Sequence, residues 1–519
     1  MRENKDVSNS VDNIYRLDGR VPISRAIPFG LQHVLAMFVG NITPILLVGG
    51  VAVYNGQAFS SIEIATLIQN CMIVAGIATL IQLYPIWRIG SRLPIVMGCS
   101  FTYLAVAMNA AAMDYGYLVG AVIIGGIIEG VLGLTIHSWQ KIIQPVVSAC
   151  VVTALGFSIL NVGVSSFGSS GAFDLGSWQN LLVGGITLVS CLVFHVVTKG
   201  FWKQLYILFG MVVGYICSIF FGMVDFADMG NTISELGVFS FPRLFAFTPK
   251  FDFGITVSFV ILFLVSAVET IGDTTAVCTG SLGRDVTDKE ISGSLAVDGL
   301  FSAISGGVFG CTPISSFSQN VGLLQLTKVV NRFSIMFGAL IMILGGLFPP
   351  IGAFISTLPD CVLGGCTVIM FGSILVTGVG MLADCGLGER NTLIAATSLC
   401  IGIGITQVDG FFELMPSIVG DVFGGNPVAG VFVVAFIMSL ILPKDMDKHS
   451  VGAKVAAENA QGPAVGTNEA SIGAEEAATD AEKTSDDVNE ASVDTQETTA
   501  GTGESVGGGE DSPVDTGGK

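Results

Sequence analysis

The chain has 519 residues, of which 51% are hydrophobic and 12% charged, and its mean hydropathy is +0.73. Soluble domains are roughly a quarter charged, so this composition excludes an ordinary soluble protein and predicts an integral membrane protein. Most of the formal net charge of −19 lies in positions 451–519, which contain 15 acidic and 3 basic residues.

Apolar runs of about 20 residues, the length of a membrane-crossing helix, recur along the chain. They predict an all-α polytopic membrane protein with fourteen transmembrane segments, the first of which is retained because no signal-peptide pattern precedes it. The segments are expected near residues 27–50, 62–83, 94–112, 117–136, 142–161, 179–198, 204–223, 253–279, 290–307, 312–327, 333–355, 360–383, 391–408 and 427–442.

The basic residues predict the orientation. With fourteen spans and a cytoplasmic N-terminus, 17 of the 19 Lys and Arg residues before Ser450 fall on the inner side of a cell membrane. The fourteen spans divide into two halves of seven. Because seven is odd, the second half enters the membrane from the opposite side, as in an inverted repeat. The expected parts are a cytoplasmic segment (1–25), a first repeat (26–223), an extracellular connection (224–252), a second repeat (253–442) and a disordered acidic cytoplasmic tail (443–519).

Isolated polar residues interrupt the apolar runs of the first repeat. Gln32 and His33 lie in the first span, where a single histidine either packs through a hydrogen bond or carries a proton. Ser100 and Phe101 lie in "MGCSFTYLA" of the third span, where the phenyl ring could stack on a flat molecule. Glu129 in the fourth span is expected to pair with another core helix rather than to bind a ligand.

Three carboxylates lie well inside the predicted spans of the second repeat. Glu269 and Asp273 are four positions apart in the eighth span and therefore share one helix face. Asp298 follows in the ninth span, either as a proton carrier or as a hydrogen-bond acceptor for nearby backbone. Carboxylates inside a membrane are costly and usually face a substrate or proton path, so at least one is expected to exchange a proton.

The tenth span contains a polar interruption, "CTPISSFSQN". Pro313 cannot continue a helical ladder, so the segment before Ser318 is predicted to be extended. A helix is predicted to begin near Ser318 or Gln319, with the serine as its N-cap. The alternative is a simple proline kink. Extended backbone inside a membrane must be buried in protein or line a cavity, and the third span carries a similar segment at the matching position. Gln319 then offers an amide that suits a heterocycle with lactam or imide edges.

Motifs of soluble enzymes are missing from the sequence. There is no P-loop, nucleophile elbow or HExxH motif, and the eleven cysteines form no CxxC pair. We therefore expect no enzyme activity, no cofactor and no metal site.

Residues 319–328 read QNVGLLQLTK. This stretch matches the signature of the nucleobase–ascorbate transporter family (nucleobase:cation symporter-2), which the chain resembles over about residues 20–442. The Gln32–His33 pair and the spacing of Glu269 and Asp273 also match. The resemblance implies a homodimer in which a core domain of spans 1–4 and 8–11 works beside a gate domain of spans 5–7 and 12–14.

The resemblance also implies that Glu269 and Gln319 hold the substrate, with Phe101, Ser100 and Asn320 beside it. A leading glutamine is typical of xanthine and uric-acid carriers in this family, whereas glutamate is typical of uracil carriers. Microbial members couple to protons and animal ascorbate carriers to sodium.

The resulting hypothesis is proton-coupled uptake of xanthine, uric acid or both by an elevator-like movement, in which Asp273, Asp298 and His33 shape or protonate the site. The expected partners are the purine, protons, the lipid bilayer and a second copy of the chain, without nucleic acid. The alternatives are a uracil carrier of the same fold, an anion exchanger or channel of the same seven-plus-seven plan, and a membrane enzyme.

Overall fold

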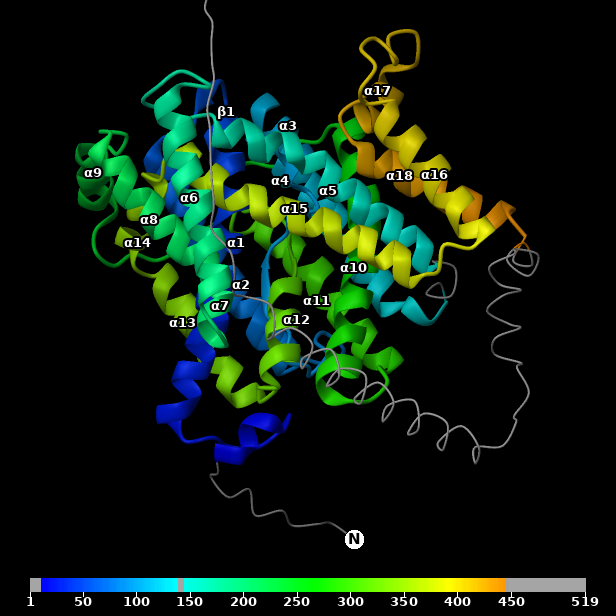
Figure 1. Cartoon of the computed structure of the whole chain (residues 1–519), viewed down its shortest axis with the longest axis horizontal. Helices are drawn as coiled ribbons and strands as arrows, with labels where there is room; N and C mark the ends of the chain where they lie inside the picture. Colours follow the sequence, from blue (N-terminus) through cyan, green and yellow to red (C-terminus); the bar gives the residue numbers. More distant parts are fainter. Residues whose placement is uncertain (1–10, 139–143, 444–445, 447–519) are drawn as a thin grey trace, which may run out of the picture. The chain divides into compact units, whose positions relative to one another are not determined.

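The computed structural model describes residues 11–138, 144–443 and 446, and the regular structure of this part is mainly helical (Figure 1). The predicted disordered tail lies almost entirely outside the described residues. The first half contains η1 (Val11–Tyr15), α1 (Ile23–Val51), β1 (Val53–Tyr54), β2 (Gln57–Ala58), α2 (Ser61–Leu83), β3 (Met97–Cys99), α3 (Leu104–Met113), α4 (Tyr115–Leu134), η2 (Ile136–Ser138), α5 (Pro145–Phe167), α6 (Trp178–Val197), α7 (Phe201–Gln204), α8 (Tyr206–Phe220) and α9 (Phe226–Leu236). The second half contains α10 (Phe253–Ala276), the π-helical turn η3 (Val277–Ser281), α11 (Asp288–Gly307), β4 (Ile314–Ser316), α12 (Ser318–Thr327), α13 (Arg332–Gly346), α14 (Pro349–Ser356), α15 (Asp360–Asp384), α16 (Glu389–Gly404), α17 (Ser417–Phe423) and α18 (Pro427–Ile441).

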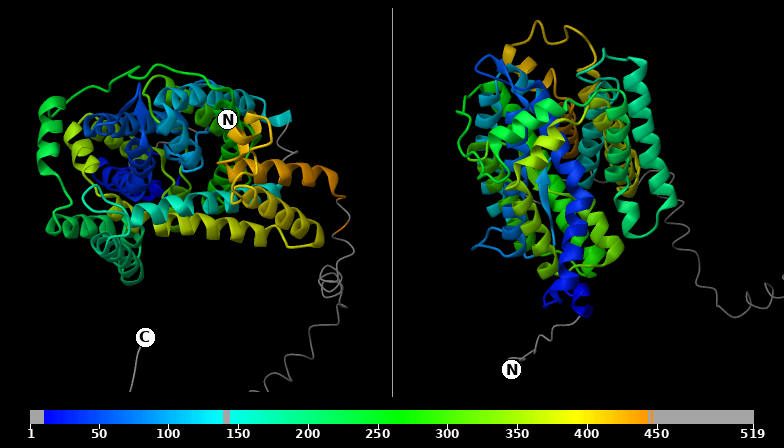
Figure 2. Two further views of the ribbon diagram at one scale, coloured as in Figure 1. Left: turned by 90° about the horizontal axis from the view of Figure 1, so that it is seen from above. Right: turned by 90° about the vertical axis from the view of Figure 1, so that its left-hand side faces the viewer.

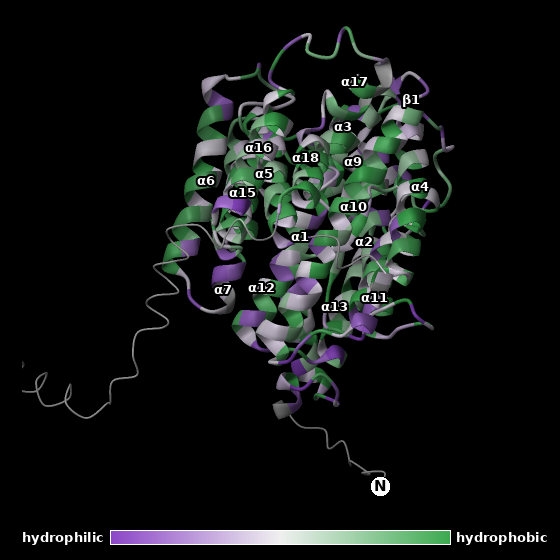
Figure 3. Ribbon diagram, turned by 90° about the vertical axis from the view of Figure 1, so that its right-hand side faces the viewer, coloured by the Kyte–Doolittle hydropathy of each residue, from purple (hydrophilic) through white to green (hydrophobic). Residues whose placement is uncertain are grey.

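Each of the fourteen predicted spans coincides with a helix or with a short pair of elements. Within the described residues, seven helices are long and apolar enough to cross a membrane, and α13 with α14, bent by 77°, would make an eighth. The remaining segments contain shorter apolar helices such as α3, α8 and α18. Figure 3 shows that apolar residues predominate along the helices. The chain is a multi-pass membrane protein, and the count of fourteen crossings stays a prediction.

The helices pack in two groups. Helices α1 to α4 and α10 to α13 contact mainly one another, and α11 lies along α4 over much of its length. Helices α5, α6, α8, α15, α16 and α18 form the other group, in which α5 and α15 lie side by side (cyan and yellow in Figure 2). The link between the groups is thinner and includes contacts of α5 with α3 and α10.

Two short strands meet inside the first group. β3 and β4 pair antiparallel, with Met97 opposite Ser316 and Cys99 opposite Ile314. The buried Asn41 of α1 accepts a hydrogen bond from the Cys99 N–H at 2.7 Å, which helps to satisfy backbone that is not part of a helix. The prediction of extended segments in the third and tenth spans is confirmed. The prediction that Ser318 caps α12 is wrong, because α12 begins at Ser318 and its hydroxyl donates to Asp273 at 2.8 Å instead.

A polar clamp ties the long connection before α10 to the corner between α3 and α4. The Lys250 ammonium donates to Asp114 Oδ2 at 2.6 Å and lies 5.7 Å from the centre of the Tyr54 ring. Asp114 also accepts hydrogen bonds from the N–H groups of Gly116 and Asn55. Burial alone would raise the pKa of Asp114, but these hydrogen bonds outweigh it and hold the pKa below its usual value.

The clamp predicts a pH-dependent stability. The pKa of Asp114 is lower in the folded protein than in the unfolded chain. Its contribution to the free energy of unfolding is therefore present above the ordinary pKa of about 3.9 and is lost as the pH falls through the folded pKa. We expect Asp114→Asn to lower the Tm of the purified protein by a few degrees at neutral pH, and the difference from wild type to shrink in acid. Thermal unfolding of both proteins at several pH values checks this, with the exposed Glu235→Gln as the control. Equal Tm values at neutral pH would contradict it.

Candidate functional site

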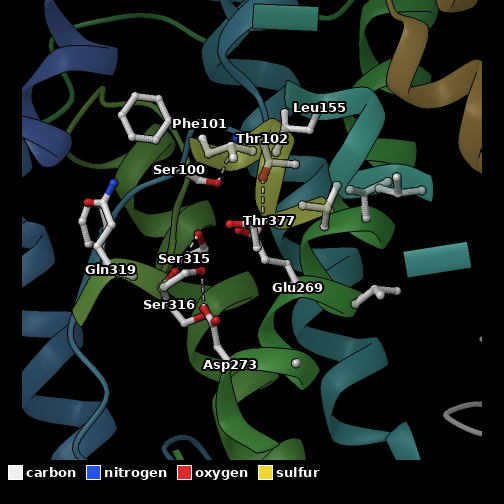
Figure 4. A pocket seen from close by; sticks show the side chains of 18 of the residues that line it. Ser100, Phe101, Thr102, Leu155, Glu269, Asp273, Ser315, Ser316, Gln319 and Thr377 are labelled. Atoms are coloured by element: carbon white, nitrogen blue, oxygen red, sulfur yellow. Dashed lines mark hydrogen bonds between the residues drawn. The ribbon is translucent and has the colours of Figure 1, made fainter. Parts of the chain in front are cut away.

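A cavity of about 500 Å³ lies where β3 and β4 meet α10 and the start of α12. This volume falls in the range of small-molecule sites. The opposite wall is formed by α5 and α15, so both groups of helices contribute to the cavity. The wall of the first group carries carboxylate, amide and hydroxyl groups, whereas the other wall is largely apolar (Figure 4).

The carboxylates of α10 form the acidic part of the cavity. Glu269 Oε2 accepts a hydrogen bond from the Thr102 hydroxyl at 2.8 Å, and Asp273 Oδ2 accepts from the hydroxyls of Ser316 at 2.9 Å and Ser318 at 2.8 Å. Both side chains are half-buried, and the residues described as lining the cavity include no Lys, Arg or His. Asp273 is therefore fixed to β4 and α12, while Glu269 is the carboxylate better placed to accept from a ligand.

Gln319 stands in the first turn of α12 and lines the cavity with its side chain exposed. Gly40 of α1 leaves the room it needs, because a Cβ at Gly40 would lie 2.6 Å from the Phe317 ring and 3.0 Å from Gln319 Oε1. In Figure 4, Gln319 and Phe101 lie toward one side of the cavity and Glu269 toward the other.

Ser100 and Phe101 lie in the segment between β3 and α3 and line the cavity. The Phe101 ring contacts Phe371 of α15 edge-on, with the ring centres 5.5 Å apart. Together these groups offer acceptors on one side, an amide with both donor and acceptor on another, and an aromatic face. This arrangement suits a flat, polar heterocycle that carries N–H donors.

Three predicted site residues lie behind the cavity and do not line it. The Asn320 amide donates to the backbone carbonyl of His33 at 3.3 Å and so holds α12 against α1. The His33 ring is buried, and its Nδ1 has no hydrogen-bond partner among the described residues. Asp298 Oδ2 accepts from the Thr270 hydroxyl and from the Ser316 N–H at 3.1 Å, so it supports β4 from behind.

Several lining residues were not predicted from the sequence. Thr102 holds Glu269, and Ser148, Ser373 and Thr377 bring hydroxyls to the wall formed by α5 and α15. A hydroxyl within an apolar helix commonly bonds to its own backbone, as Ser373 does to the Ile369 carbonyl at 2.7 Å, so its sequence gives no sign of a binding role.

Comparison with known proteins identifies the family. The "Permease family" model (Xan_ur_permease) matches residues 24–411. The chain therefore belongs to the nucleobase–ascorbate transporter family. Members of this family are permeases, and the family membership expected from the signature at residues 319–328 is confirmed.

Relatives of this nucleobase–ascorbate transporter cover most of its length. A putative purine permease of Clostridium perfringens is 31% identical over 447 residues, which is 85% of this chain and 95% of the relative. Xanthine permease XanQ of Escherichia coli is 31% identical, covering 83% of this chain and 94% of the relative. A xanthine permease of Bacillus subtilis is 32% identical, covering 80% and 93%.

Among solved structures, the transporter is similar to murine solute carrier 26 family member A9, an anion transporter. The TM-score is 0.54 at 12% identity, and the match covers 81% of this chain and 68% of that one. At this identity the likeness concerns the fold alone, so it supports a membrane-transporter fold and gives no argument about substrate.

Proposed function

We propose that this nucleobase transporter takes up xanthine, uric acid or both together with protons across the cell membrane. The observation that carries the proposal is the cavity in which Glu269 and Gln319 are both accessible to one small molecule. A carboxylate can accept from purine N–H groups, and an amide can pair with a neighbouring N–H and C=O. The names of the bacterial relatives support a purine rather than the uracil or anion alternatives.

The proposed mechanism is an elevator-like movement of α1 to α4 and α10 to α13 against the other group of helices. Its support is that the carboxylates and the amide of the cavity all belong to the first group, so the bound purine would travel with it. We further propose that both termini are cytoplasmic and that the protein works as a homodimer. Asp273, Asp298 and His33 shape or protonate the site in this scheme.

Uptake by cells that lack their own purine carriers tests the proposal. We expect labelled xanthine or urate to accumulate, excess unlabelled purine to compete, and a protonophore to abolish accumulation. Ready entry of uracil without either purine would contradict the substrate assignment. Accumulation that resists the protonophore would contradict proton coupling.

Gly40 gives a further prediction, since its missing side chain makes room for Gln319. Gly40→Ala is expected to displace the Phe317 ring and the Gln319 amide and to reduce the initial rate of uptake at low xanthine by about tenfold, as small misplacements of binding groups do. Gly50→Ala is the matched control, because a Cβ at Gly50 of the same helix meets nothing within 4 Å. Equal rates in the two variants, at equal amounts in the membrane, would rule out this role for Gly40.

A further inference from the structure

A second acidic centre lies behind the cavity, around Glu129 of α4. Glu129 is 1% exposed, and neither of its carboxylate oxygens has a hydrogen-bond partner among the described residues. An ionised carboxylate without a counter-charge is very costly in such surroundings, which favours its neutralisation by a bound cation, the simplest being a proton. The sequence-based expectation that Glu129 pairs with another core helix leaves this neutralisation unexplained.

The Glu129 side chain cannot turn away toward lipid at low cost, because α4 and α11 approach closely on both sides of it. A Cβ at Gly126 would lie 2.6 Å from the Gly299 carbonyl oxygen, and a Cβ at Gly130 would lie 2.8 Å from Leu300. The two glycines thus let α4 and α11 pack closely, and this close packing fixes the register of the two helices. Glu129 therefore stays inside the interface.

The polar and acidic groups that interact with Glu129 come from α11, from α10 and from the segment before α3. Asp298 comes from α11, Ser266 and Glu269 come from α10, and Tyr103 precedes α3. The Tyr103 ring is held by two phenylalanines of α10, with ring centres 4.7 Å from Phe263 and 6.0 Å from Phe259. The charged groups that interact with Glu129 are the acidic Asp298 and Glu269.

Three of these neighbours share its lack of partners. The Tyr103 hydroxyl, the Ser266 hydroxyl and Asp298 Oδ1 are all buried without a direct hydrogen bond among the described residues, and the Ser266 hydroxyl lies near both Glu129 and Tyr103. Buried polar atoms in native proteins are nearly always satisfied, so several unsatisfied oxygens in one cluster point to a missing component. A proton on one carboxyl would supply a donor and remove a charge at once.

We propose that Glu129, together with Asp298, Tyr103 and Ser266, forms a buried proton-binding site that is separate from the purine site and holds the transported proton. The inference rests on the proposed proton-coupled function and names its coupling site. One proton binds a carboxylate oxygen as an O–H group and leaves to water on the other side of the membrane, with no other bond changed. Asp298 connects the two sites, because its other oxygen accepts from the Ser316 N–H of β4, beside the cavity.

The test uses the full-length protein in vesicles that contain a pH-sensitive dye. Wild type is expected to exchange labelled xanthine at equal pH, to accumulate it under an inward proton gradient, and to acidify the lumen as it does so. Glu129→Gln keeps the shape but cannot release a proton. We expect it to exchange xanthine but to lose both accumulation above the equilibrium level and acidification, while the exposed Glu235→Gln behaves as wild type.

The possible outcomes distinguish an error in the proposed Glu129 site from an error in the proposed proton coupling. Gradient-driven accumulation by Glu129→Gln at the wild-type level would overturn the proposed site, whereas wild type that exchanges xanthine without responding to the gradient would overturn proton coupling itself. Accumulation driven by a sodium gradient at equal pH would overturn the identity of the cation. If Glu129→Gln does not fold, Ser266→Ala is expected to shift the pH of half-maximal gradient-driven uptake, and an unchanged midpoint would overturn the site.

Discussion

Glu269→Gln is expected to reduce the initial rate of xanthine uptake by roughly 10- to 100-fold at low substrate. The replacement keeps the size of the side chain and its hydrogen bond with Thr102 but removes the charge that we propose accepts from purine N–H groups. Hydrogen bonds to charged groups are worth about 1.5–3 kcal/mol, and each 1.4 kcal/mol corresponds to about a tenfold change in affinity. Initial rates of labelled xanthine uptake, normalised to the amount of protein in the membrane, measure the effect.

The matched control for this substitution is Asp273→Asn. Asp273 is one turn away on the same face of α10, but its Oδ2 already accepts from Ser316 and Ser318. We therefore expect Asp273→Asn to act more on the arrangement of β4 and α12, and to lower the Tm together with uptake, whereas Glu269→Gln lowers uptake with an unchanged Tm. Uptake by Glu269→Gln within twofold of wild type would remove Glu269 from the purine site.

Gln319→Glu is expected to cause the second large loss, again by roughly 10- to 100-fold for xanthine. The amide donor becomes an acceptor, so a purine carbonyl that it serves is left without a partner, at a cost of about 1–3 kcal/mol. The new carboxylate also adds a like charge to a cavity that already holds Glu269 and Asp273. Competition by unlabelled xanthine, urate and uracil against each labelled substrate measures the change in preference.

Gln319→Asn is the control for that substitution, because it keeps the amide chemistry on a shorter side chain. We expect it to retain more xanthine uptake than Gln319→Glu and to keep the wild-type order of preference among the three bases. If Gln319→Glu keeps the wild-type order and affinity, the amide does not read the substrate, and specificity must reside elsewhere in the cavity.

The sequence predicted those parts of the site that depend on local chemistry. Four-residue spacing places Glu269 and Asp273 on one face of α10, and Pro313 interrupts the helix before α12, wherever these elements pack. The sequence also predicted extended segments in the third and tenth spans, and the structure pairs them as β3 and β4, which satisfies backbone that has left a helix inside the membrane.

Features that depend on how helices dock could not be predicted. Gln319 and Asn320 are adjacent in α12 and point in different directions, and only the packing of α12 on α1 turns Asn320 toward His33. Thr377 reaches the cavity only because α15 lies opposite α10. Nothing local to Glu129 indicates that its carboxylate stays without a partner once α4 and α11 have packed.

A structure of the purified protein determined with bound xanthine would show whether Glu269 and Gln319 hold the purine. We expect the purine to lie in the cavity between β3, β4 and α15, with N–H groups within hydrogen-bond distance of the Glu269 carboxylate and an edge against the Gln319 amide. Xanthine bound elsewhere, or bound in this cavity without contact to either side chain, would contradict the account.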